Sequence, residues 1–141
     1  MSGAPKIGQI WLDVDFFGDG TKKKYFLVLA LTKDGDVVHR NLTKQGKGRG
    51  DNPRCHHGAP FDGFYLGVLG GPLTLPTWLD LGDWDDLDDL TFAKWSKSGK
   101  IKYVMELAKP DLCLALRCAA GAVSGRQRLR VMESVGALSC P

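Results

Sequence analysis

The sequence predicts a mainly β protein, a small and partly open antiparallel barrel with appended helices. Two observations predict this class. Apolar residues follow strand patterns over much of residues 10–81, and glycine-containing turns separate the segments. Helical signals appear only later in the chain. At 141 residues the chain is expected to form one domain over 1–141, with a core of about 6–121 and a helical tail over 122–141.

Three strands are predicted near the N-terminus. Apolar residues occupy every second position of residues 10–16, which is the period of a half-buried strand. Residues 25–31 are continuously apolar, as is typical of a central strand. The pair Asp34-Gly35 is a hairpin signal, so residues 36–43 are predicted to return antiparallel to residues 25–31.

A long basic loop and a mixture of strands and helices are expected in the rest of the chain. Residues 44–60 are rich in glycine and cations, which predicts a mobile loop of a length that often serves a function. The segment 85–98 has an acidic start and a basic end, which complement a helix dipole. The remaining expected elements are strands at 64–69, 77–81 and 101–107 and helices at 110–121 and 125–135.

Charge is unevenly distributed along the sequence. Residues 20–57 hold nine Lys or Arg and three Asp, whereas residues 80–90 hold six Asp and no cation. This distribution predicts a basic side, which suits an anionic partner, although solvated loops are an equal alternative. The net charge of +3 is too small to identify a nucleic-acid-binding protein by itself.

The sequence indicates neither a membrane segment nor a cofactor. No apolar run approaches the roughly 20 residues that span a bilayer, and the N-terminus lacks the apolar core of a secretory signal. A cytoplasmic location is therefore expected, and with it four reduced thiols. Two of them, Cys113 and Cys118, are expected to be small core residues of an apolar helix.

A cation and a hydroxyl are predicted to meet where the second and third strands pair. Lys24 precedes the strand 25–31 and Thr43 ends the strand 36–43, so antiparallel pairing brings them to one end of the hairpin. Such a pair can hold a phosphate. Neighbouring cations extend this site into a predicted patch for single-stranded nucleic acid: Lys22, Lys23, Arg40, Lys44, Lys47, Arg49 and Arg54.

The motif Cys55-His56-His57 suggests two further chemistries. Cysteine and histidine are zinc ligands, but ligands from one loop need a partner, and no second cluster offers standard spacing. A Cys–His nucleophile pair lacks an identifiable third residue that would orient the base. The sequence therefore predicts no metal site.

The element order and a few residues resemble the PemK/MazF family. The resemblance rests on the opening Gly8-x-Ile10-Trp11, the charged turn that follows, the segment 27–29 and the strand end at Thr43. It covers most of residues 7–118. It implies an SH3-like barrel and a toxin that cleaves single-stranded RNA without a metal and is neutralised by an antitoxin. It also implies a two-fold homodimer.

The resemblance also implies catalytic roles. Lys24 stands where the family has an arginine, and Thr43 stands where it has a threonine or serine. Metal-independent cleavage needs a cation at the phosphorane and groups that move protons. Lys24 is expected to supply the charge, Thr43 to hydrogen-bond a phosphate oxygen, and His39 to move protons, with His56 and His57 as alternatives.

Two other functions are open on the sequence. A non-catalytic barrel would bind RNA or an acidic protein partner, because Lys24 lacks the guanidinium fork that grips a phosphate. A plain interaction domain would instead use the basic loop 44–60 to bind an acidic peptide.

Overall fold

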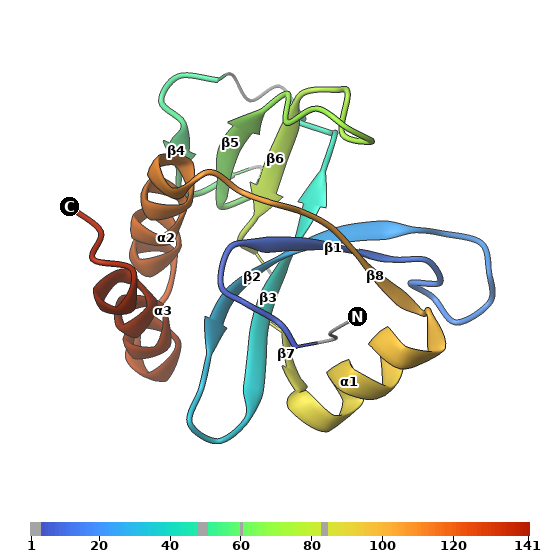
Figure 1. The fold of residues 1–141 in the computed structure, drawn as a ribbon. Coiled ribbons are helices and arrows are strands. Elements are labelled where there is room, and N and C mark those ends of the chain that lie inside the picture. The colour runs from blue at the N-terminus through green and yellow to red at the C-terminus, as the bar shows by residue number, and fades with distance from the viewer. Residues whose placement is uncertain (1–3, 48–50, 60, 83–84) are drawn as a thin grey trace.

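The fold is an open antiparallel sheet with helices on its sides (Figure 1). The computed structural model describes residues 4–47, 51–59, 61–82 and 85–141. The strand order is β4-β5-β6-β3-β2-β1-β8, and β7 pairs with β3 beside this path. The strands are β1 (Gln9–Asp13), β2 (Lys24–Leu31), β3 (Asp36–Thr43), β4 (Cys55–His56), β5 (Gly63–Gly67), β6 (Thr77–Asp80), β7 (Asp85–Asp88) and β8 (Ile101–Glu106). The helices are α1 (Asp89–Ser98), α2 (Lys109–Ala122) and α3 (Gly125–Ala137).

This architecture confirms the predicted mainly β class, its antiparallel pairing and the appended helices. β2 and β3 form the predicted hairpin, in which Phe26 lies opposite Asn41. β1 pairs with β2 on one side and with β8 on the other. The sheet does not close, as expected of a partly open barrel. Over the described residues, no helix is long and apolar enough to cross a membrane.

The central strand β2 is buried on both faces, which explains its continuous apolar sequence. Leu27 and Leu29 belong to a core cluster that includes residues of β5, β6, α2 and α3. Phe26 and Val28 point into a second cluster, which includes Phe92 of α1. Figure 1 shows α2 and α3 side by side at one side of the sheet and α1 at its other end. Two apolar cores therefore share one strand.

The acidic segment before α1 differs from its prediction. A helix was expected from residue 85, because acidic residues favour helix N-termini. Residues 85–88 instead form β7, in which Leu87 pairs with Val37 of β3. The helix begins only at Asp89. Its N-cap is Asp88, whose carboxylate accepts a hydrogen bond from the Thr91 N–H at 2.8 Å. Pairing with β3 therefore overrides the helix signal in this segment.

The expectation of four reduced thiols is wrong for this structure. Cys55 forms a disulfide with Cys118, and Cys113 forms one with Cys140. The first bond ties β4 to α2, and the second ties the C-terminal end to the same helix. The end of the predicted mobile loop 44–60 is therefore fixed to the helical layer.

Candidate functional site

A cavity of about 380 Å³ lies at the end of the β2–β3 hairpin where β2 begins and β3 ends. It unites the two residues that the sequence placed at a phosphate site, Lys24 and Thr43, with three other predicted cations. Its lining comprises Lys22, Lys23, Lys24, Tyr25, Leu42, Thr43, Lys44, Gln45, Pro72, Leu73, Thr74, Leu75 and Thr77.

Strand pairing explains how the hydroxyl and the cation come together. The β2–β3 register pairs Phe26 with Asn41, so the residues just beyond this pair reach the cavity from both strands. The ammonium of Lys24 lies 5.8 Å from the centre of the Phe16 ring, which favours a cation there. The hydroxyl of Thr43 accepts a hydrogen bond from the Gln45 N–H at 3.1 Å. Its own proton therefore remains available for an anion.

The charged side chains in the described lining of this cavity are all of one sign. The described lining residues include four lysines but no aspartate, glutamate or histidine. Among the described residues, none of these four lysines forms a salt bridge. Ammonium and hydroxyl groups bind phosphate oxygens well. The described lining is therefore equipped to bind a phosphate but includes no carboxylate or imidazole that would act as a general base.

A further part of the cavity lining was not predicted from the sequence. It comes from the connection between β5 and β6, with Thr74 and Leu75, and from Thr77 at the start of β6. The hydroxyl of Thr77 is buried and donates a hydrogen bond to the Leu75 carbonyl at 3.0 Å. The sequence signal for this part of the lining is the turn Gly70-Gly71-Pro72, which folds the connection back over the sheet.

His39 does not line the cavity. Its ring packs on Phe26 with 4.7 Å between ring centres, and its Nδ1 lies 3.4 Å from the Val37 carbonyl oxygen. His39 and Thr43 are four residues apart on one strand, which corresponds to about 13 Å. The structure therefore separates the predicted proton carrier from the predicted phosphate ligands.

Two of the predicted patch arginines make contacts within the fold. Arg40 is only 3% exposed, and its guanidinium donates to the His39 carbonyl at 3.1 Å. Arg54 donates to the Tyr65 carbonyl at 3.0 Å and forms a salt bridge with Asp111 of α2 at 3.1 Å. Lys47 is exposed but does not line the cavity, and Arg49 lies outside the described residues.

One aspartate of the acidic segment 80–90 is paired with a buried cation. Arg130 of α3 is 6% exposed and forms salt bridges with Asp36 of β3, at 3.1 Å, and with Asp86 of β7. Burial disfavours the charged guanidinium, but hydrogen bonds and charges from both carboxylates raise the pKa of Arg130. The acidic segment therefore docks on α3 through one buried cation.

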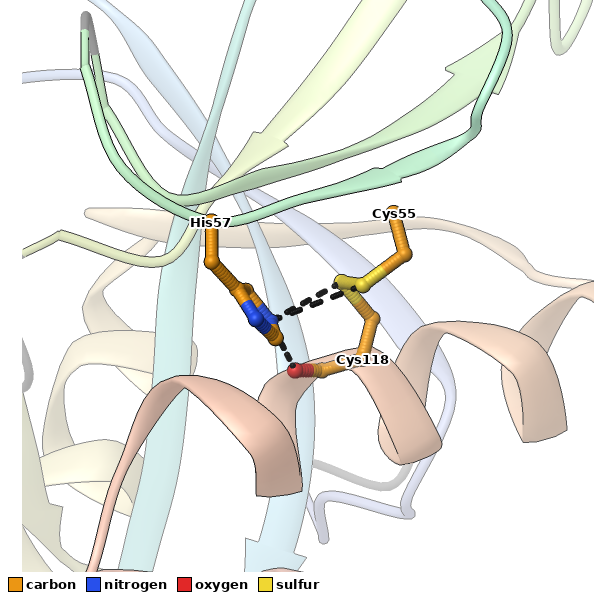
Figure 2. Close-up of side chains that lie close together, drawn as sticks. All are labelled: Cys55, His57 and Cys118. Carbon is orange, nitrogen blue, oxygen red and sulfur yellow. Dashed lines mark hydrogen bonds between the residues drawn. A yellow bond between two sulfur atoms is a disulfide. The ribbon is translucent and has the colours of Figure 1, made fainter.

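A second group of reactive side chains lies between β4 and α2. Figure 2 shows the imidazole of His57 facing the Cys55–Cys118 disulfide. Its Nε2 lies 3.5 Å from the Cys55 sulfur, 3.8 Å from the Cys118 sulfur and 3.0 Å from the Cys118 carbonyl oxygen. The sequence motif contains the two loop residues but not Cys118, because 63 positions separate Cys118 from Cys55.

Comparisons with models of known protein families, with curated proteins and with solved structures found no significant match to this chain.

Proposed function

We propose that this protein binds single-stranded RNA through the lysine-lined cavity. The observation that supports this proposal is the convergence of Lys24, Thr43 and three further lysines on one cavity whose described lining has no acidic side chain. Phosphate groups are the natural partners of such a surface. Tyr25 adds an aromatic ring on which a base can stack. We also propose a cytoplasmic location, where RNA is abundant and where the two disulfides would be kept reduced.

The proposal predicts a strong dependence of affinity on salt. If all four cavity lysines contact phosphates, the slope of log affinity against log salt is about −2.8 for a single strand. Raising the salt from about 50 to 200 mM then lowers the affinity about 50-fold. Titration of a labelled oligonucleotide at several salt concentrations measures this slope.

A matched pair of variants tests the location of the site. Replacing Lys22, Lys23 and Lys44 by Gln should reduce the magnitude of the slope by about 2, because three phosphate contacts are lost. Replacing the exposed Lys33, Lys94 and Lys97 by Gln removes the same charge elsewhere and should leave the slope nearly unchanged. Equal losses in both variants would contradict a localised site. Binding of polyglutamate in preference to RNA would favour the acidic protein partner instead.

A second candidate is a metal-independent endoribonuclease toxin of the PemK/MazF kind, with an antitoxin as its protein partner and a homodimer as its assembly. The observation that favours it is that Lys24 and Thr43, which correspond to the family's arginine and threonine, line the same cavity. Since the described lining has no general base, the main contribution of the enzyme would be charge stabilisation of the phosphorane.

Cleavage of a mixed-sequence RNA with chelator present tests the enzymatic candidate. Lys24→Ala should lower the rate about 10²–10³-fold, as removal of a preorganised charge stabiliser does. Thr43→Ala should lower it less, and Lys24→Arg should preserve or raise it. If the wild type and Lys24→Arg are both inactive, the protein is a binding module and not a nuclease.

A further inference from the structure

The cluster of Cys55, His57 and Cys118 contains three side chains that bind soft and borderline metals. Each offers one ligand atom, and all three ligand atoms lie within 4.8 Å of one another. They come from β4, the residue after it and the middle of α2, so the fold and not a local sequence motif assembles them. This cluster is separate from the lysine-lined cavity.

The distances from the imidazole nitrogen to the two sulfurs are close to those of a tetrahedral zinc site. With Zn–S bonds of about 2.3 Å and Zn–N bonds of about 2.0–2.1 Å, a tetrahedral site separates nitrogen from sulfur by about 3.6 Å. The His57 Nε2 lies 3.5 and 3.8 Å from the two sulfurs. The imidazole therefore stands at a ligand's distance from both sulfurs.

A glycine of α2 makes room for the imidazole. A Cβ at Gly121 would lie 2.7 Å from the Cε1 of His57, which is far closer than van der Waals contact allows. Glycine inside a helix costs roughly 1 kcal/mol relative to alanine. The contact with His57 gives this unfavourable residue a structural reason.

We propose that Cys55, His57 and Cys118 form a zinc site when their disulfide is reduced. A dithiol reductant supplies two electrons and two protons, breaks the S–S bond and becomes a disulfide itself. Zn²⁺ then binds both sulfurs and the His57 Nε2, and the two thiol protons are released. Binding replaces the contact of Nε2 with the Cys118 carbonyl. A water takes the fourth position, which the exposure of His57 allows.

The oxidised and the zinc-bound states would both join β4 to α2, through different bonds. The disulfide joins β4 to α2 under oxidising conditions, and zinc joins them where thiols stay reduced. In both states the end of the loop 44–60 stays fixed to the helical layer.

Cobalt titration of the reduced full-length chain tests this proposal, because cobalt–thiolate sites absorb in the near ultraviolet. The protein is reduced with a phosphine, which is then removed without air. We expect a charge-transfer band that saturates at one Co²⁺ per chain and disappears when Zn²⁺ is added. The double variant Cys113→Ser/Cys140→Ser should keep this band, and Cys55→Ser/Cys118→Ser should lose it. No band, or a band that follows Cys113 and Cys140, would overturn the proposal.

Two single variants test the imidazole. His57→Gln should weaken cobalt binding at least tenfold, whereas His56→Gln should leave it unchanged. Gly121→Ala should weaken it about 10–100-fold by displacing the ring, while the oxidised protein still forms the disulfide. Full affinity in His57→Gln would show that His57 is not a ligand.

Alkylation of the wild-type protein avoids the risk that a variant misfolds. Zn²⁺ should slow labelling of reduced Cys55 and Cys118 but not of Cys113 and Cys140, as measured by mass spectrometry of the peptides. If Zn²⁺ does not change the labelling rate of any of the four cysteines, the proposal is also overturned.

Discussion

The charged side chains at the two ends of β3 differ in whether they form salt bridges. At its start, Asp36 is paired with the buried Arg130, which also binds Asp86 of β7. At its end, Thr43 faces a cavity with four lysines that form no salt bridge within the described residues. The charges at the start of β3 are matched inside the fold, whereas the described lining at its end holds cations of one sign and no acid. We therefore expect the charges at the start of β3 to contribute to stability, and we propose those at its end for RNA binding.

The largest expected change in stability follows from removing the charge of Arg130. Arg130→Met should lower the free energy of unfolding by about 2–4 kcal/mol, because it leaves two carboxylates without their partner. The effect should stay below that of a fully buried pair, since the side chains of Asp36 and Asp86 are 27% and 28% exposed. Urea unfolding measures the change.

Arg126 provides the matched control on the same helix. Its pairing with Asp34 spans 3.9 Å between side chains that are 73% and 79% exposed. Arg126→Met should therefore change stability by less than about 0.5 kcal/mol. Equal losses of unfolding free energy in Arg130→Met and Arg126→Met would contradict the difference between the buried and the exposed ion pairs.

A smaller effect, on RNA affinity, is expected when an acidic side chain is placed in the lysine-lined cavity. Gln45→Glu should weaken RNA binding about threefold to fivefold, which corresponds to about 0.6–1 kcal/mol for an exposed ion pair. Stability should hold or rise slightly, because the new carboxylate relieves repulsion among the lysines. The neutral variant Gln45→Met separates charge from shape in the same binding assay. Weaker binding in both variants would assign the effect to shape.

The smallest effect concerns Asp88 at the acidic side. Hydrogen bonds from the Thr91 N–H and hydroxyl lower the pKa of Asp88 below its usual value in the folded state. The stability that this cap contributes is therefore present above the unfolded pKa and is lost as the pH falls through the folded pKa. Compared with Asp88→Asn, the wild type should lose stability as the pH falls below about 4. A difference that stays constant from pH 3 to 6 would contradict this assignment.

The sequence predicted the strands of the cavity because local patterns encode them. Alternation, a continuous apolar run and an Asp-Gly turn specify the hairpin, and the hairpin places Lys24 and Thr43 together. The segment 85–88 shows where local signals fail. Aspartates favour a helix start and are rare in strands, yet tertiary pairing with β3 decides the outcome.

The cysteine cluster could not be found from the sequence for a different reason. Four cysteines allow three disulfide connectivities, and sequence alone does not choose among them. The role of Arg130 could not be predicted either, because the same helix carries the exposed Arg126 and the sequence does not distinguish the two. Both features depend on which distant elements the fold brings into contact.

The pairing of β1 with β8 has a consequence for synthesis on the ribosome. Asp13 pairs with Ile101, so one edge of β1 stays without its strand until β8 has been made. At about 5–20 residues per second, translation of the intervening chain takes about 4–18 s. During that interval the nascent chain presents an open edge to other unfinished chains. This edge of β1 is therefore expected to be most exposed to aggregation during synthesis, before β8 covers it.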